Sequence, residues 1–240
     1  MRLNIDLHCH SHFSADGIAH PDKMVAQAKR KGLHGFAITD HNTCACIDYF
    51  IKKGYIRADG QPVDDFLIIP GQEISTSKGH LLALGVYLPD MKGISPKEAV
   101  DIVHSKGGLA IPAHPYDFFR SGIPEADLEN LPIDALEVFN AATTFAKYNR
   151  QAFEYATRKG LPMTAGSDAH HLTPLGKSYT ILEPKSFDVQ GVLESIRNPV
   201  GRHEEYLTGK DIFVKTFYNL FRFLRSAEVR RLRATGGGIP

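Results

Sequence analysis

Histidine and carboxylate side chains stand at the ends of successive apolar runs in this 240-residue chain. His8 and His10 close the first run, His41 closes the second, and Glu73 closes the third. Groups this far apart in sequence meet when each lies at the carboxyl end of a parallel strand. The pattern therefore predicts an α/β fold in which several strands deliver polar side chains to one edge.

Two later apolar runs end in the same way. His114 follows one of them, and Asp168 and His170 follow the other. Neutral imidazoles and carboxylates bind divalent metal ions, and a crater that collects several of them has room for more than one ion. On a strand, residues two apart point the same way, so His8 and His10 can grip one ion. A pair of surface histidines is the alternative, but Asp168 and His170 repeat the same spacing, which favours a metal site.

The order of the apolar and amphipathic segments predicts a closed barrel related to the TIM fold. We expect strands over residues 3–7, 35–39, 66–70, 80–88, 109–112, 135–139 and 163–167. We expect helices over residues 21–31, 47–53, 95–105 and 144–159. An open doubly wound sheet is the alternative. It is disfavoured because nearly every strand end carries polar side chains, whereas such a sheet gathers them in one crevice.

The chain is long enough for one large domain, which we predict over residues 1–210. Residues 211–235 combine phenylalanines at helical spacing with several arginines. We predict a basic amphipathic helix there that packs on the barrel or on a second subunit, so a homo-oligomer is expected to form through it. An anionic membrane surface is the alternative partner for this helix. Residues 236–240 are predicted to be a flexible tail.

Composition excludes several classes of protein. A net charge of +1 gives no global argument for binding nucleic acid or membranes. No apolar run is long enough to cross a bilayer, and the first residues lack the pattern of a signal peptide. Three cysteines form no disulfide framework, and Cys44 and Cys46 are expected to pack in a helix rather than bind metal. We therefore expect a cytoplasmic protein.

Glu73 follows an apolar strand, where a carboxylate is costly to bury unless it is paired or bound to metal. Its two oxygens suit it to bridge two cations. His80 opens the next predicted strand and can reach the site from the rim, although a structural histidine is a strong rival here. His114 ends its strand in a proline-flanked turn that can aim the ring at the site. A hydrogen bond to the turn backbone is its weaker alternative.

The remaining candidates are less specific. Asp16 can supply a hard oxygen ligand from the loop after the first strand, although a turn aspartate before glycine is its alternative. His41 is preferred as a ligand to Asp40, which is expected either to orient an imidazole or to cap a helix. Glu137 and Asn140 are candidates for supporting the ligands or contacting substrate. His12 is expected to support the ligands or to be exposed.

Together these motifs resemble the PHP family, named for polymerase and histidinol phosphatase. The resemblance covers roughly residues 3–200. It rests on His8-Cys9-His10, Thr39-Asp40-His41, Gly71-Gln72-Glu73, Ala113-His114-Pro115 and Gly166-Ser167-Asp168-Ala169-His170. The resemblance implies a distorted (β/α)7 barrel with up to three divalent ions, typically Mn, Fe or Zn, at its carboxyl end.

The resemblance also assigns the ligands. It implies that His8, His10, Glu73 and Asp168 hold the first ion. It implies that Glu73 bridges to a second ion held with His80 and His114. It implies that Asp16, His41 and His170 hold the third, where other members of the family have a histidine in place of Asp16.

Clustered dications can polarise a phosphoryl group and generate a hydroxide nucleophile at neutral pH. We therefore predict hydrolysis of a small phosphomonoester or phosphodiester. Arg120 is the first choice for a phosphate clamp and Arg150 the second, with a surface ion pair as the alternative for either. The residues predicted to act directly in catalysis are Glu73, Asp168, His170 and Arg120.

Three other functions stay open. A PHP-type exonuclease or other nucleic-acid phosphodiesterase is disfavoured, because the sequence shows no groove of aromatic and basic residues. An amidohydrolase also begins with His-x-His, but Glu73 stands where a carboxylated lysine is expected. A regulatory, non-catalytic PHP module predicts missing ligands, whereas the set here is complete.

Overall fold

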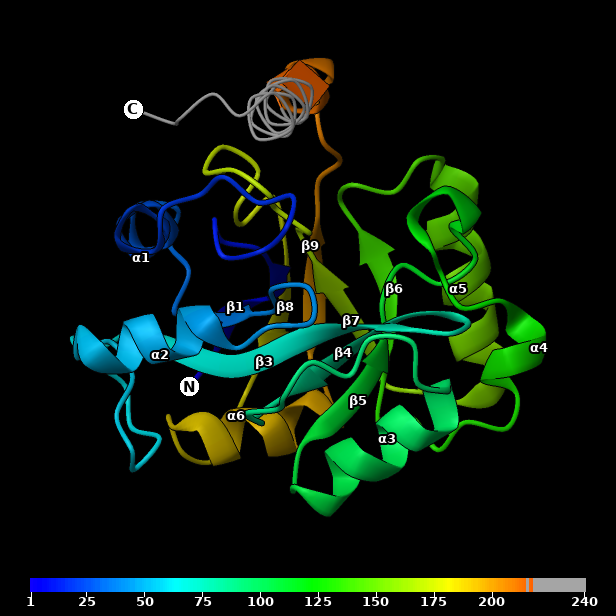
Figure 1. Cartoon of the computed structure of the whole chain (residues 1–240), viewed down its shortest axis with the longest axis horizontal. Helices are drawn as coiled ribbons and strands as arrows, with labels where there is room; N and C mark the ends of the chain where they lie inside the picture. Colours follow the sequence, from blue (N-terminus) through cyan, green and yellow to red (C-terminus); the bar gives the residue numbers. More distant parts are fainter. Residues whose placement is uncertain (215, 218–240) are drawn as a thin grey trace, which may run out of the picture. The chain divides into compact units, whose positions relative to one another are not determined.

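The computed structural model describes residues 1–214, 216 and 217. The chain divides into two compact units, Met1–Tyr206 and Leu207–Pro240. In the first unit the strands lie at the centre and the helices lie around them (Figure 1). The sheet order is β5-β4-β3-β2-β1-β8-β9, and β6 and β7 form a separate pair.

The first three strands run parallel, as the sequence predicts. β1 (Leu3–Cys9) pairs with β2 (Gly35–Ile38), and β2 pairs with the first part of β3 (Leu67–Thr76). The helices α1 (Pro21–Arg30) and α2 (Ala45–Lys52) make the two crossovers. All four residues of β2 are buried, which is typical of a strand that is covered on both faces.

β3 is longer than the sequence predicts, because it changes partner at Pro70. Beyond Pro70 it pairs antiparallel with β4 (Gly79–Leu84), so Glu73 lies within the strand and not after it. Only two residues link β3 to β4, too few for the crossover that parallel strands need. Gly79 makes this turn possible, because it has φ +144° and a Cβ there would lie 2.7 Å from the Ser121 carbonyl oxygen.

The next strands carry the second half of the site. After α3 (Pro96–Ser105), β5 (Leu109–Pro112) pairs antiparallel with β4. A short 3-10 helix, η1 (Phe118–Arg120), and α4 (Glu125–Leu128) follow. The last parallel pair is β6 (Leu136–Asn140) and β7 (Met163–Gly166), joined by α5 (Ala146–Lys159).

Besides η1 and α4, three elements are absent from the sequence prediction: β8 (Ser178–Leu182), α6 (Val189–Ile196) and β9 (Gly201–Glu204). β8 pairs antiparallel with β1, and β9 with β8. α6 begins at Asp188, whose side chain accepts a 2.7 Å hydrogen bond from the Gly191 amide. These elements cover one side of the barrel and extend the sheet beyond the seven predicted strands.

The end of β7 lies beside the end of β1 and closes the ring of strands. The Asp168 amide donates to the His8 carbonyl at 2.7 Å, and the His10 amide donates to the Ala169 carbonyl at 2.8 Å. The fold is a distorted (β/α)7 barrel. The predicted closed barrel is thus confirmed, and the doubly wound alternative is wrong.

Apolar side chains fill the barrel away from these strand ends. Ile5, Leu7, Ile69 and Ile111 are buried in one cluster with residues of α6. Full burial of such a side chain contributes about 1.5–3 kcal/mol relative to exposure. Cys44 and Cys46 are free, buried thiols in the neighbouring cluster and pack as expected.

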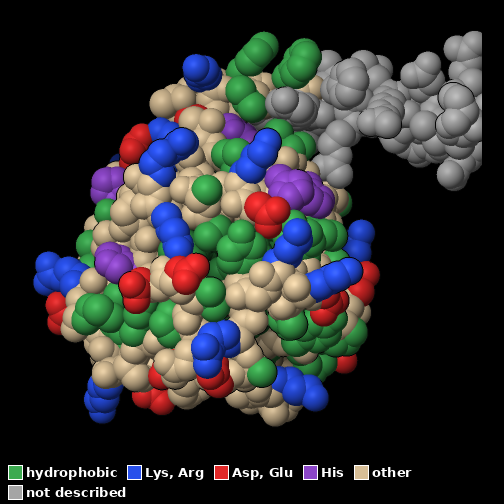
Figure 2. All heavy atoms as spheres, turned by 90° about the vertical axis from the view of Figure 1, so that its left-hand side faces the viewer, with side chains coloured by type: hydrophobic (Ala, Val, Ile, Leu, Met, Phe, Trp, Pro, Cys, Tyr) green, Lys and Arg blue, Asp and Glu red, His purple; other side chains and the backbone are tan. Residues whose placement is uncertain are grey.

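Residues 209–214, 216 and 217 are helical, and the rest of the helix predicted over 211–235 lies outside the described residues, as does the 236–240 tail. Within the described part of the chain, every helix is too short or too polar to cross a bilayer. Figure 2 shows the face of the first unit that α1 and α2 cover, where basic and acidic side chains are interspersed.

Candidate metal centre

All the predicted ligands come together at one end of the barrel. They form four overlapping groups, and within each group one ligand atom per residue lies within 4.8 Å of the others. The groups are His8, His10 and Glu73; His8, His114 and Asp168; His41, Glu73 and His80; and His10, Asp16, His41 and His170. The overlap of the groups makes a single centre of several adjoining sites.

Glu73 lies at the middle of the centre, almost fully buried. Its Oε2 atom faces three imidazoles, at 3.2 Å from Nε2 of His8, 3.1 Å from Nε2 of His10 and 3.3 Å from Nδ1 of His41. His8 is on β1, His10 follows the end of β1 directly, and His41 follows β2 by three positions. Oε2 therefore belongs to the side of the centre that β1 and β2 build.

The other oxygen of Glu73 faces a different set. Its Oε1 atom lies 2.8 Å from Nδ1 of His80 and 3.1 Å from Nε2 of His114. His80 is on β4 and His114 follows β5, so the hairpin that lengthens β3 also brings His80 to the site. A carboxylate with two separate sets of partners has the geometry of a bridging ligand.

Asp168 occupies the loop after β7, at φ +50°. Its Oδ1 atom lies 3.6 Å from Nε2 of His8, 3.4 Å from Nε2 of His10 and 3.4 Å from Nδ1 of His170. Its Oδ2 atom pairs with the Arg120 guanidinium. A left-handed backbone is uncommon for aspartate, so the turn holds this carboxylate against its local preference.

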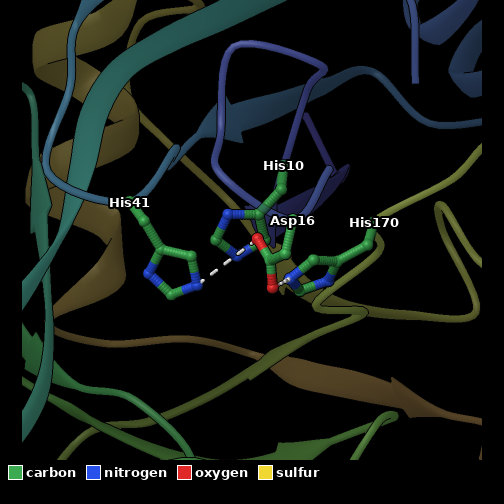
Figure 3. A group of neighbouring side chains, drawn as sticks. All are labelled: His10, Asp16, His41 and His170. Atoms are coloured by element: carbon green, nitrogen blue, oxygen red, sulfur yellow. Dashed lines mark ion pairs between the residues drawn. The ribbon is translucent and has the colours of Figure 1, made fainter. Parts of the chain in front are cut away.

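Figure 3 shows the outer group, in which Asp16 lies between His41 and His170 beside the ring of His10. Asp16 Oδ2 is 2.8 Å from Nε2 of His170, and Asp16 Oδ1 is 3.8 Å from Nε2 of His41. Asp16 therefore faces the centre from its loop, as a ligand would. A turn role alone does not explain this orientation.

A second layer of side chains holds the rings in place. Glu137 Oε1 lies 3.0 Å from Nδ1 of His8, and Glu137 Oε2 accepts from the His114 amide at 2.6 Å. Asn140 donates to Glu137 at 3.0 Å and to Asp168 at 3.1 Å. A carboxylate behind a ligating imidazole fixes its orientation and raises its basicity. Of the two roles left open for Glu137 and Asn140, the geometry favours support of the ligands.

Two aspartates hold the loops that carry ligands. Buried Asp6 accepts from the Ser167 amide at 3.0 Å, which anchors the turn before Asp168. The sequence analysis gave Asp6 no role, although a carboxylate inside an apolar strand indicates a buried group that needs hydrogen-bond partners. Asp40 accepts from the Ser11 amide and hydroxyl, each at 2.6 Å. Asp40 therefore does not cap α2, whose N-cap residue is Cys44, and that expectation was wrong; it holds the backbone directly after His10 instead.

The two arginines predicted as phosphate clamps lie at different places in the structure. Arg120 reaches into the centre and pairs with Asp168, whereas Arg150 lines a different cavity with Phe153 and Arg202. His12 is exposed and stacks on Phe13 with ring centroids 4.5 Å apart. Of the two predicted arginines, Arg120 is therefore the one that lies at this centre.

The carboxylates keep their charge although they are buried. Burial acts to raise the pKa of Glu73, but the surrounding imidazoles, His41 first, hold it well below its usual range. Burial also acts to raise the pKa of Asp168, which Arg120 and His8 hold well below its usual range. Both side chains are thus anionic at neutral pH.

The carboxylates in turn raise the pKa of the innermost imidazoles. Burial favours the neutral form of His10, but hydrogen bonds to Asp168 and Glu73 raise its pKa to about 9. Burial likewise opposes charge on His8, whose pKa Asp168 and Glu137 nevertheless raise well above the usual value. Without a cation, His10 is protonated at neutral pH, and its charge adds to that of the Arg120 guanidinium beside Asp168.

The residues present fit divalent ions. Among the described residues, Nδ1 of His41, Nδ1 of His80 and Oδ1 of Asp168 are buried and have no hydrogen-bond partner. Buried polar atoms are normally hydrogen-bonded, and a ligated ion is one explanation where they are not. Mixed imidazole and carboxylate donors suit Mn, Fe and Zn. These three atoms are among the predicted ligand atoms, although buried atoms of other residues, such as Gln72 Oε1, also lack a hydrogen-bond partner.

Metal binding at pH 7 should release protons. His10 has a pKa of about 9, so it is protonated before an ion binds and neutral afterwards. Burial lowers the pKa of His41 to about 4, so this ring has no proton to lose. The apparent affinity should rise with pH up to about pH 9, by about tenfold per unit for each proton released.

Calorimetric titration with Mn²⁺ in buffers of different ionisation enthalpy measures this release. The His10→Gln protein should release fewer protons than the native chain. The control variant His12→Gln, at an exposed position, should release as many protons as the native chain. Affinity that does not change between pH 6 and pH 8 would contradict the prediction.

Comparisons with known proteins agree with this geometry. The profile of the PHP domain family matches residues 6–172, and that of the PHP-associated family matches residues 146–199. An uncharacterized protein of Methanocaldococcus jannaschii is 31% identical over 149 residues, which cover 58% of this chain and 82% of that protein. A probable histidinol-phosphatase of Thermotoga maritima is 32% identical over 132 residues, which cover 55% of this chain and 44% of that one.

Among solved structures, an endonuclease Q bound to a 27-mer duplex with an abasic lesion has a TM-score of 0.66 and 19% sequence identity. The match covers 85% of this chain and 58% of the endonuclease chain. At this identity the likeness shows a shared fold. The chain spans less than two thirds of both the endonuclease and the probable histidinol-phosphatase.

Proposed function

We propose that this chain, which belongs to the PHP family and is a metal-dependent phosphoric ester hydrolase, cleaves a small phosphomonoester or phosphodiester. The observation that supports the proposal is the buried Glu73 carboxylate, whose two oxygens face separate sets of imidazoles. Such a bridge suits two ions held side by side, the arrangement that serves in-line displacement at phosphorus. The probable histidinol-phosphatase among the relatives supports a small ester as substrate.

Up to three ions, of Mn, Fe or Zn, would be held in this centre. By the resemblance to the family, His8, His10, Glu73 and Asp168 would hold the first, Glu73, His80 and His114 the second, and Asp16, His41 and His170 the third. When bound, such ions polarise phosphoryl oxygens and lower the pKa of water to near neutrality. When only the first two ions are bound, His170 and Asp16 of the outer group can take a proton from an entering water or return one to a leaving oxygen.

Arg120 would orient the phosphate. Its side chain is partly exposed and pairs with one oxygen of Asp168, and its Nε atom has no partner among the described residues. A guanidinium offers several donors in a fixed plane, which matches the oxygens of a phosphoryl group. It can therefore keep its contact with Asp168 and still bind substrate.

The Arg120→Ala protein should keep its metal but lose activity. We expect kcat/KM to fall by about 10²-fold, because a positive charge aimed at the transferring group is lost. Metal content should be unchanged or higher, since Asp168 loses a competing cation. Atomic absorption and phosphate release measure the two effects. The Arg150→Ala protein is the matched control and should behave as the native chain, whereas loss of metal from Arg120→Ala would contradict the clamp role.

A panel of phosphoesters tests the proposal as a whole. Protein purified without chelators should contain Mn, Fe or Zn and release phosphate or alcohol from at least one small ester. Carboxyl esters and amides should not react, which separates the proposal from an amidohydrolase. If protein that contains its metal leaves every phosphoester intact, the regulatory interpretation is correct instead.

A further inference from the structure

Arg120 stands on a short and strained segment of backbone. It ends η1, which has three residues, and this helix is flanked by left-handed backbone at Tyr116, with φ +69°, and at Ser121, with φ +57°. A single 3-10 turn has poor hydrogen-bond geometry, and left-handed backbone costs free energy for residues other than glycine. Contacts from outside the segment must therefore hold Arg120 in place.

The backbone of this segment is tightly wound around Asp117. The Asp117 carbonyl accepts from the Arg120 amide and from the Gly122 amide, each at 2.9 Å. A Cβ on Gly122 would lie 2.3 Å from the His114 carbonyl oxygen and 2.8 Å from the Asp117 amide nitrogen, so a side chain does not fit there. The position of Asp117 thus sets the path of the backbone as far as Arg120.

The side chain of Asp117 ties this segment to the loop before α5. Asp117 directly precedes η1, yet its fully buried carboxylate does not cap that helix. Its Oδ2 atom instead accepts from the Thr143 hydroxyl at 3.0 Å and from the Thr144 amide at 2.6 Å. Hydrogen bonds to an ionised acceptor are stronger than those between neutral groups. The carboxylate therefore anchors η1 to a segment that lies 26 and 27 residues further along the chain.

The charge of Asp117 also acts on Arg120. Burial opposes the charged form of the guanidinium. The carboxylates of Asp168, Glu73 and Asp117 act against burial and raise the pKa of this arginine above its usual value. In the part of the chain that the structure describes, Asp117 Oδ1 and Arg120 Nε are both buried and have no hydrogen-bond partner. The guanidinium thus pairs with Asp168 and has a second carboxylate three residues before it.

We propose that Asp117 is a positioning residue, which holds the Arg120 guanidinium where it can bind the phosphoryl group of the substrate. This inference rests on the proposed function and adds a residue to its site. The four ligand groups do not include Asp117, so its effect on the substrate passes through Arg120. Thr143 and Thr144 contribute from the other side, because they fix the carboxylate.

A double-mutant cycle between Asp117 and Arg120 tests this role. The substrate is the small phosphoester that the native chain cleaves fastest. Asp117→Ala should lower kcat/KM about 10- to 100-fold, because a misplacement of about 1 Å can cost a factor of this size. In the Arg120→Ala background the same substitution should change kcat/KM by less than about 2-fold, since the group that it positions is gone.

Inorganic phosphate gives a second measurement that needs no turnover. Its dissociation constant for the Mn²⁺-loaded protein, measured by calorimetry, should rise by about 10-fold or more in Asp117→Ala, as expected when a charged donor is misplaced. The double variant should bind phosphate as weakly as Arg120→Ala does. Asp117→Asn keeps one acceptor oxygen and should recover part of the binding. The metal content of all these variants should be native.

Two substitutions at Thr143 serve if Asp117→Ala folds poorly. Thr143→Val removes the hydroxyl donor at nearly constant shape, so phosphate binding should weaken in the same direction but less. Thr143→Ser keeps the hydroxyl and is the matched control, which should bind phosphate as the native chain does. A Thr143→Val protein that binds phosphate as tightly as Thr143→Ser would count against the anchor.

The outcomes separate this role from others. Equal effects of Asp117→Ala in the native and Arg120→Ala backgrounds, or none in either, overturn the inference. Loss of metal from Asp117→Ala also overturns it, because the segment would then act through His114, whose carbonyl accepts from the Asp117 amide at 3.2 Å. If the native chain hydrolyses no phosphoester, the proposed function fails, whereas the phosphate cycle still decides the role of Asp117. A native chain that binds no phosphate overturns that role as well.

Discussion

The Glu73→Gln protein should lose nearly all turnover, with kcat reduced by about 10³-fold or more, because several kcal/mol of charge stabilisation depend on the ions that Glu73 joins. Glutamine keeps the shape of the side chain but has one acceptor oxygen and no charge. The imidazoles on the Oε2 side and those on the Oε1 side would no longer share an anionic bridge. Metal analysis should therefore find fewer than the native number of ions per chain.

A matched control is available for this substitution. Glu154 is exposed on α5, and Glu154→Gln removes the same charge far from any predicted ligand. Its activity and metal content should equal those of the native chain. Circular dichroism should show the native helix content in both variants, since β3 keeps its backbone pairs with β2 and β4. Native activity in a folded Glu73→Gln protein would refute the bridging role.

The position of the site was predictable because strand ends carry its residues. His8 lies near the end of β1, and His41 and His114 follow β2 and β5. Because side chains two apart on a strand point the same way, His10 lies on the same side as His8. The burial of these side chains can be inferred from sequence, because a polar residue at the end of an apolar strand lies at the edge of the core. The barrel itself was predictable for the same reason.

What was not predictable depends on contacts between distant segments. The hairpin at Gly79 reverses β4, and nothing in the apolar run 80–88 distinguishes an antiparallel from a parallel strand. Asp40 has the spacing of an N-cap, yet Ser11 takes both of its oxygens. β8 and β9 were missed because short strands are specified by the strands they pair with more than by their own sequence.

The electrostatics of the centre explain why so many charges can be buried together. Glu73 and Asp168 are held anionic, His8 and His10 have raised pKa values, and Arg120 pairs with Asp168. Each buried charge therefore has an opposite charge beside it, which offsets much of the cost of desolvation. The barrel end can thus keep its shape when an ion leaves, because protons on imidazoles replace part of the lost positive charge.

Removal of the metal should therefore abolish turnover but leave the first unit folded. An ion at a concentration of about 1,000 times its dissociation constant stabilises the native state by about 4 kcal/mol. For a domain of this size, each kcal/mol shifts Tm by about 2–4 °C, so the chelated protein should melt roughly 8–16 °C lower. Scanning calorimetry with and without chelator measures the shift.

Readdition experiments complete this test and identify the metal. After chelation and dialysis, Mn²⁺, Fe²⁺ and Zn²⁺ should each be added alone, and at least one should restore both Tm and phosphoester hydrolysis. Mg²⁺ should restore less, because a centre built largely from imidazoles does not suit a hard cation that prefers oxygen ligands and keeps its water. If Tm recovers with a metal and hydrolysis does not, the ions support the fold alone. Full activity after chelation would mean that Glu73 and its imidazoles serve a reaction without metal, and a hydroxide nucleophile would then need another source.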